Sequence, residues 1–151
     1  MARRGAWDRT TLLAEPEGLL RLGIGELLSR AGSPAACFAS AEEVLNEATR
    51  REKPPALLIT AGQLPGLDGL SLARALRARW PELAVVVIAD AGIKGEGWWR
   101  ALPPRSALLE RPVAEGVLLA LVLRLVPREA LRPRKVRPAA MAPRGTLAPA
   151  G

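Results

Sequence analysis

The sequence contains no histidine and no tyrosine, and it has a single cysteine, Cys37. Without histidine, the chain lacks the commonest general acid–base group and the commonest metal ligand. One cysteine cannot form an internal disulfide or a thiolate metal cluster. Cys37 lies in the apolar run "AACFA", where we expect a buried core residue, with a reactive thiol as the alternative. These absences argue against an enzyme, and the sequence predicts no cofactor and no metal site.

Aromatic residues and long apolar runs are also scarce. Aromatics make up 3% of the 151 residues, so Leu, Val, Ile and Ala must supply the core, and a hydrophobic content of 49% is enough for one domain. The longest apolar run, residues 117–123, is too short to span a bilayer. The opening "MARRGAW" is not followed by the apolar stretch of a signal peptide. We therefore expect a cytoplasmic protein without a membrane segment.

Short apolar runs alternate with helical patterns along the chain. The runs predict five strands, near residues 10–14, 35–39, 56–61, 83–89 and 106–109. Helical patterns cover residues 19–31, 40–51, 70–80 and 113–126. This alternation predicts an α/β fold with a five-stranded parallel sheet and helices on both faces. Residues 90–105 hold two glycines and a Pro-Pro pair, which leave room for a short or irregular fourth helix.

The two ends of the chain differ in composition from the middle. We expect an N-terminal extension over residues 1–9, one domain over 10–126, and a disordered tail rich in Pro and Ala over 127–151. Much of the formal net charge of +7 falls in this tail, which includes Arg132, Arg134, Lys135 and Arg137. The tail suits either a solubilising or linker role, or weak nonspecific binding of nucleic acid or another polyanion. It has no aromatic residue to stack on bases.

Three segments together resemble the receiver domains of bacterial response regulators, the CheY-like group. They are "FASAEEVL" (38–45), "LPGLDGLSLARALRARWPELAVVVIA" (64–89) and "ALLERPV" (107–113). The "LPGLDG" loop and the closing step from a basic residue to proline are the most specific marks, and the similarity covers roughly residues 10–126. The resemblance implies a flavodoxin-like fold in a single domain and a place in two-component signal transduction or a phosphorelay.

The resemblance also assigns site positions, and this sequence departs from the family at each. Receivers hold Mg²⁺ with an acidic pair after the first strand, phosphorylate an aspartate after the third, and carry Thr or Ser after the fourth and Lys after the fifth. These positions fall on Glu15 and Pro16, then Ala61, Ala89 and Arg111. Alanine offers no nucleophile, one carboxylate makes a poor Mg²⁺ site, and a guanidinium is not an ammonium. The resemblance therefore implies a degenerate pseudo-receiver.

Three nearby oxygen-bearing residues are alternative but poorer candidates for the missing acceptor. Asp68 opens a helix, where a carboxylate is expected on structural grounds alone. Asp90 follows the fourth strand and approaches the pocket from one side. Thr60 precedes Ala61 and should point to the opposite face of the sheet. The resemblance further implies a cis peptide bond before Pro112, an isomer that few X-Pro bonds adopt.

The first functional hypothesis is a signalling module that binds proteins, including a second copy of itself, without phosphorylation. The helix over 113–126 is apolar around most of its circumference, whereas a surface helix needs one apolar stripe. The surplus either meets a partner or completes a core that is poor in aromatics. The interface candidates are Trp98, Trp99, Val117, Leu118, Leu121, Val122 and Leu125. The alternatives are polyanion binding by the tail, and binding of an anion or small molecule in the vacated pocket.

Overall fold

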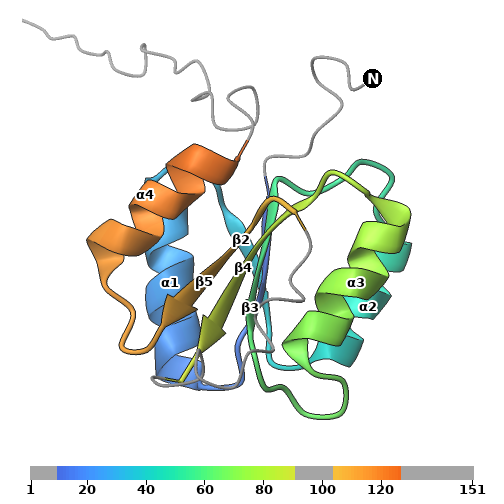
Figure 1. Ribbon diagram of the computed structural model, residues 1–151, viewed down its shortest axis with the longest axis horizontal. Coiled ribbons are helices and arrows are strands. Elements are labelled where there is room, and N and C mark those ends of the chain that lie inside the picture. Colours follow the sequence, from blue (N-terminus) through green and yellow to red (C-terminus); the bar gives the residue numbers. More distant parts are fainter. Residues whose placement is uncertain (1–9, 91–103, 127–151) are drawn as a thin grey trace, which may run out of the picture.

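A parallel sheet lies between two pairs of helices (Figure 1). The computed structural model describes residues 10–90 and 104–126. The strands are β1 (Thr11–Ala14), β2 (Ala35–Phe38), β3 (Leu57–Ala61), β4 (Ala84–Ala89) and β5 (Ser106–Glu110). The helices are α1 (Gly18–Arg30), α2 (Ala41–Thr49), α3 (Gly69–Arg79) and α4 (Glu115–Leu125). Helices α1 and α4 cover one face of the sheet, and α2 and α3 cover the other.

The strand order confirms the predicted flavodoxin-like fold. The order is β2-β1-β3-β4-β5, and every neighbouring pair is parallel. The chain runs outward from β1 to β2 and then returns to place β3 on the other side of β1. The direction of winding therefore reverses between β1 and β3, and in such sheets a crevice opens at the carboxyl ends of the two strands.

The three central strands are mostly apolar and fully buried because both of their faces are covered. Every residue of β1, β3 and β4 is buried. Successive side chains point to opposite faces, so Leu57 and Ile59 pack beside α1 and α4, while Leu58 packs beside α2 and α3. Each fully buried aliphatic side chain stabilises the fold by roughly 1.5–3 kcal/mol. The short apolar runs of the sequence predicted these strands correctly.

Two helix starts follow the chemistry expected of caps. At α2, the Ser40 hydroxyl accepts from the Glu43 N–H, and the Glu43 carboxylate accepts from the Ala39 N–H. At α3, Asp68 accepts from the Ser71 N–H at 2.7 Å. Asp68 thus performs the capping role that sequence reasoning gave it. No helix within residues 10–90 and 104–126 combines the length and the apolarity needed to cross a bilayer.

The expectation that Cys37 belongs to the core is wrong. Its side chain is exposed on β2, because β2 is an edge strand and has a neighbour on one side only. On α1, Gly25 lies beside this sulfur, since a Cβ added at Gly25 would be 3.2 Å from it, and glycine has no side chain to cover it. Partial burial still raises the pKa of the Cys37 thiol, while the positive charge of Arg21 acts in the opposite direction. A raised pKa leaves less of this thiol as thiolate at neutral pH.

Helix α4 turns some of its interface candidates toward the core and leaves another exposed. Leu118 and Val122 are wholly buried, so these two interface candidates belong to the core. Leu121 and Leu125 are partly buried and pack against the same cluster. Of the candidates on α4, Val117 keeps half of its surface exposed. The expected short fourth helix, Trp98, Trp99 and the basic tail lie outside the described residues, apart from the stretch at 104–105.

The close packing of α3 against the end of β3 can be tested by substituting a glycine. A Cβ at Gly69 would lie 2.1 Å from the Ala61 carbonyl oxygen, a backbone atom that cannot move aside, whereas a Cβ at Gly23 meets nothing within 4 Å. We expect Gly69→Ala to lower the free energy of unfolding by about 1–3 kcal/mol through overpacking. The matched control, Gly23→Ala, should raise it by up to about 1 kcal/mol, because alanine is the better helix former. Urea unfolding measures both; equal stabilities would contradict the close approach of α3 to β3.

Candidate functional site: a crevice at the ends of β1 and β3

A cavity of about 580 Å³ opens where the winding of the sheet reverses. Its walls come from the loops that follow β1, β3, β4 and β5, so segments far apart in sequence meet there. Among the lining residues are the carboxylates of Glu15, Glu17, Asp68 and Asp90, and the guanidinium of Arg111. Excess negative charge therefore surrounds one fixed cation.

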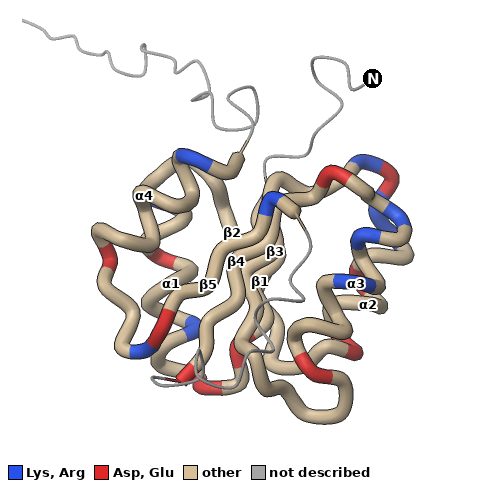
Figure 2. Tube along the Cα trace, in the orientation of Figure 1, with Lys and Arg blue, Asp and Glu red and all other residues tan. Residues whose placement is uncertain are grey.

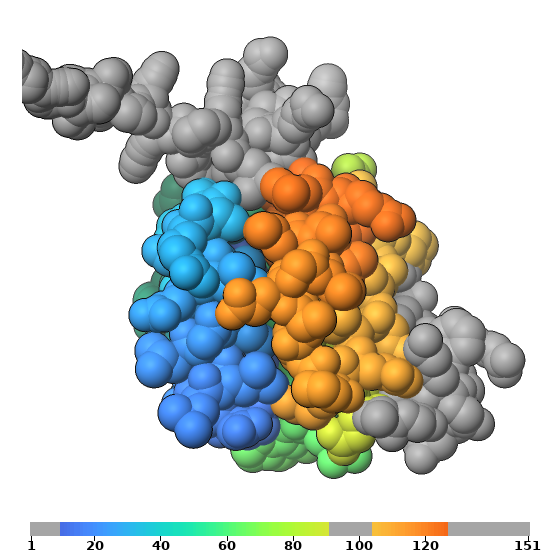
Figure 3. Space-filling model, turned by 90° about the vertical axis from the view of Figure 1, so that its left-hand side faces the viewer, coloured from blue at the N-terminus to red at the C-terminus, as the bar shows by residue number. Residues whose placement is uncertain are grey.

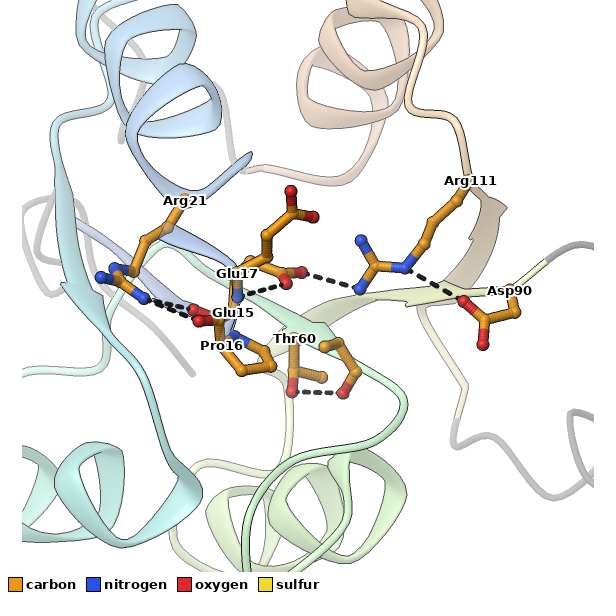
Figure 4. A network of polar contacts seen from close by, with 8 residues as sticks. Glu15, Pro16, Glu17, Arg21, Thr60, Asp90 and Arg111 are labelled. Carbon is orange, nitrogen blue, oxygen red and sulfur yellow. Dashed lines mark hydrogen bonds and ion pairs between the residues drawn. The ribbon is translucent and has the colours of Figure 1, made fainter. Parts of the chain in front are cut away.

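The Glu15 carboxylate is the most deeply placed charge in the crevice. Its side chain is 1% exposed. One oxygen accepts from Nη2 of Arg111 at 2.9 Å, and the other accepts from the Glu17 backbone N–H, also at 2.9 Å (Figure 4). A buried carboxylate is tolerated when it is paired and hydrogen-bonded, and both oxygens of Glu15 meet that condition.

Arg111 joins the last strand of the sheet to the first loop. Its Nε lies 3.3 Å from a carboxylate oxygen of Asp90, so one guanidinium bridges two carboxylates (Figure 4). Its backbone N–H donates to the Ala89 carbonyl at 2.8 Å, which continues the β4–β5 pairing to the edge of the crevice. The peptide bond between Arg111 and Pro112 is cis, the isomer that sequence reasoning expected.

The loop after β1 is held by a residue that sequence reasoning missed. Nη1 of Arg21, in the first turns of α1, donates to the Glu15 carbonyl at 2.8 Å and to the Pro16 carbonyl at 3.3 Å. These bonds fix the backbone that presents Glu15 to Arg111. The signal in the sequence is weak, because a basic residue a few positions into a helix is common on any surface.

The floor of the crevice is apolar and closed. Ala61 is 1% exposed and does not line the cavity. The Thr60 hydroxyl is buried and donates to the Ala61 carbonyl at 2.9 Å. The Gly62 N–H donates to the Ile88 carbonyl at 2.7 Å, and the Gly69 N–H donates to the Gly62 carbonyl. At the end of β3, therefore, the residues present backbone atoms to the cavity and no reactive side chain.

Comparison of the sequence with known proteins finds two curated relatives. No family model matches the chain. The chain is 35% identical over 81 residues to the transcriptional activator protein ExaE of Pseudomonas putida, an alignment that covers 52% of this chain and 37% of that protein. It is 31% identical over 88 residues to the DNA-binding transcriptional regulator NtrC of Klebsiella pneumoniae, covering 58% and 17%. The chain thus spans well under half the length of either relative.

Solved structures match over nearly their whole length. A sensor protein from Polaromonas sp. JS666 is 30% identical, with a TM-score of 0.68, over 77% of this chain and 94% of that one. The receiver domain of NtrX from Brucella abortus is 26% identical, with a TM-score of 0.65, over 76% and 96%. A response regulator receiver protein from Sinorhizobium medicae WSM419, at 24% identity and a TM-score of 0.70, supports the fold. The chain belongs to the response-regulator receiver domains.

The structure of this receiver domain brings together most of the site residues predicted from the sequence. Glu15, Pro16, Ala89 and Arg111 all line the crevice, whereas Ala61 lies beneath it. Asp90 also lines the crevice and pairs with Arg111, a contact that sequence reasoning did not foresee.

The residues present do not fit the Mg²⁺ ion that receivers of this group use. Magnesium demands several oxygen ligands in near-octahedral geometry. Here both oxygens of Glu15 are already engaged, and Pro16 stands in the second acidic position. A guanidinium lies where a cation would have to approach Glu15. Among the residues that the structure describes, no cluster of three or more His, Cys, Asp or Glu is placed to hold a metal ion.

The pairing of Glu15 with Arg111 predicts a pattern in a double-mutant cycle. Arg111→Met should lower the free energy of unfolding by about 3 kcal/mol, because it leaves a buried carboxylate without a counter-charge. Adding Glu15→Gln to Arg111→Met should recover part of the loss, since a neutral amide costs less to bury than a charge. The control, Asp90→Asn, removes an exposed partner and should cost less than about 1 kcal/mol. Additive effects of the two buried changes would show that the residues are not coupled.

Proposed function

We propose that this receiver domain is a protein-interaction module of two-component signalling that works without phosphorylation. One observation carries the proposal. The acceptor position is occupied by Ala61, whose side chain is a buried methyl group, and Glu15, the one acidic residue left of the acidic pair, is paired with Arg111. Receiver domains generally act as signalling modules through partner proteins rather than as enzymes. A receiver that keeps the fold and lacks the acceptor retains the surfaces for such partners.

The chemistry of phosphoryl transfer supports this reading. The step needs a nucleophilic oxygen in line with phosphorus, and a cation that neutralises the charge of the transferring group. Ala61 supplies no oxygen, and the hydroxyl of Thr60 is buried and bonded to backbone. Arg111 carries a positive charge, but two carboxylates share it.

The crevice gives less support to the anion-binding alternative. An anion would have to approach Arg111, whose guanidinium already contacts Glu15 and Asp90. It would also meet the carboxylates of Glu17 and Asp68 on the cavity wall. An anion in this site is therefore repelled by more charges than attract it.

Incubation with acetyl phosphate and Mg²⁺, followed by intact-mass measurement, tests the proposal. We expect no added phosphate, because Ala61 offers no nucleophile, and we expect low millimolar Mg²⁺ to leave the fluorescence and the melting temperature unchanged. A receiver domain that carries the acceptor aspartate serves as the positive control. A mass increase of one phosphoryl group that hydroxylamine removes would overturn phosphorylation independence.

Polyanion binding is a second candidate, favoured by the charge of residues 127–151 alone. Arg132, Arg134, Lys135 and Arg137 lie close together in a stretch that contains no aromatic residue. Such a segment binds nucleic acid through phosphate contacts and counterion release, without reading sequence.

Salt dependence tests this second candidate. The full chain should bind DNA of any sequence weakly, with an affinity that falls steeply as salt is raised, and a chain ending at residue 126 should not bind. Fluorescence anisotropy with two unrelated duplexes measures both effects. Preference for one duplex, or equal binding by the shortened chain, would contradict charge-driven association through the tail.

A further inference from the structure

Basic residues gather at the end of the sheet opposite the crevice, where β3, β4 and β5 begin. They come from the loop between α2 and β3, from the last turn of α3, and from the position just before β5. These three strands are neighbours in the sheet, so the basic groups lie in a row. Figure 2 shows most of the blue at this end of the molecule and most of the red at the crevice end. The row is called the basic edge, and its members are Arg50, Arg51, Lys53, Arg77, Arg79 and Arg105.

Two arginines at the end of α3 are fixed by main-chain carbonyls of other segments. Arg79 donates to the carbonyls of Ala48 and Arg51, in and just after the last turn of α2. Arg77 donates to the carbonyl of Pro104, just before β5. These bonds join the three parts of the basic edge to one another. They also hold the planar guanidinium groups in place before any ligand arrives.

Arg105 fixes the far end of the row. Its guanidinium donates to the Glu82 carbonyl at 3.1 Å and to the Leu125 carbonyl at 3.0 Å. Its backbone has a φ of 61°, in the left-handed region that few residues other than glycine adopt. A guanidinium has five N–H donors, so Arg105 keeps donors for a ligand after making these two bonds.

The positive charge of these arginines is not neutralised, because carbonyls accept their hydrogen bonds. Within residues 10–90 and 104–126, none of Arg77, Arg79 and Arg105 forms an ion pair with a carboxylate. Partial burial lowers the pKa of the Arg77 guanidinium, the positive charge of Arg105 lowers it further, and Glu82 acts in the opposite direction. Like charges are therefore held close together at this end of the domain.

Ordinary structural causes explain only part of the basic edge. The helix dipole favours basic residues in the last turn of a helix, which accounts for Arg77 and Arg79. It does not account for Lys53 or Arg105, because both lie outside the helices. A neutral donor could also bond to the carbonyls, so the bonds alone do not explain the concentration of charge.

The basic edge has little apolar surface. In the described part of the chain, the large hydrophobic side chains with high exposure are Leu19, Leu22, Leu67, Val117 and Leu123, and none lies in the loops that precede β3, β4 and β5. A protein partner usually meets an apolar centre, and a membrane surface takes up aliphatic or aromatic side chains. A nucleic-acid backbone is bound through phosphate contacts and needs neither.

The basic tail leaves the domain from the same end. Figure 3 shows that α1 and α4 both end there, and the last carbonyl of α4 accepts from Arg105. Arg132 follows Val126 by six residues, which span at most about 20 Å of extended chain. The tail and the basic edge can therefore reach the same ligand.

Building on the second candidate function, polyanion binding by the tail, we propose that the basic edge binds the phosphate backbone of a nucleic acid together with the tail. Guanidinium forks match the geometry of phosphate oxygens, and groups that are already fixed lose little conformational entropy on binding. The basic edge makes few contacts by itself. It gains affinity because the tail holds the ligand at a high effective concentration beside it. Contacts of this kind position the backbone and do not read base sequence.

The first experiment measures binding of the full chain to a short fluorescent DNA duplex by anisotropy at several salt concentrations. Lys53→Gln should weaken binding and make the slope of log K against log salt shallower by about 1, because one phosphate contact is lost. Arg105→Gln should do the same, whereas Arg105→Lys keeps the charge and should retain most of the slope. Circular dichroism of each variant shows whether the fold is kept. Equal losses for Arg105→Gln and Arg105→Lys would show that Arg105 acts only through its carbonyl bonds.

A matched pair of acidic residues controls for net charge. Glu52 lies beside Lys53 at the basic edge, and Glu42 lies in the first turn of α2 at the crevice end, and both are exposed. Glu52→Gln should strengthen binding a few-fold, because it removes a repulsion from the phosphates. Glu42→Gln changes the net charge by the same amount and should leave the affinity unchanged. Equal gains from the two variants would overturn a binding site located at the basic edge.

The identity of the partner is tested with other polyanions at the same salt concentration. Polyglutamate stands for an acidic protein segment, and vesicles containing phosphatidylserine stand for a membrane surface. The duplex should bind more tightly than either. Tighter binding to polyglutamate or to the vesicles would overturn nucleic acid as the partner of the basic edge.

The outcomes separate this proposal from the candidate function on which it rests. If removing residues 127–151 abolishes binding and the changes at Lys53 and Arg105 have no effect, the basic edge is overturned and the tail stands. If those changes weaken binding and a chain ending at residue 126 binds as well as the full chain, the tail is overturned instead. A full chain that does not bind the duplex overturns both.

Discussion

The ion pair between Glu15 and Arg111 is the contact on which the arrangement of the crevice depends. It joins residues 96 positions apart, at the end of β1 and just after β5. A carboxylate that is 1% exposed cannot stay ionised without a partner at low cost, so the loops must converge to supply one. Arg21 then holds the β1–α1 loop, and Asp90 extends the pairing toward solvent. The result is a pocket whose central cation is part of the chain.

A cation built into the chain differs from a bound metal in a way that matters for signalling. A metal and a phosphoryl group come and go, and each arrival changes the charge that the surrounding loops experience. Arg111 is part of the chain and is permanently present. It therefore supplies the same counter-charge to Glu15 whether or not a ligand occupies the crevice. The proposed loss of the switch follows from this constancy as much as from the missing nucleophile at residue 61.

Local signals in the sequence predicted the fold well. They did not predict the contacts between segments that are distant along the chain. The strands β3 and β4 are almost entirely apolar because both faces of each strand are covered, so the apolar runs alone identified them. The exposure of Cys37 depends on which strand lies at the edge of the sheet, and no local pattern records that. The bridge from Arg111 to Glu15 joins opposite ends of the domain, so neither spacing nor propensity could reveal it.

A domain with one stable electrostatic state constrains how its surfaces can be regulated. A ligand or partner shifts a conformational equilibrium only as far as it binds one state better than another. If the crevice of this receiver has a single arrangement, then its association with partner proteins depends on protein concentration and on competing partners, not on phosphate at the strand ends. Regulation would then act on the amount of the protein and on the partners that it meets.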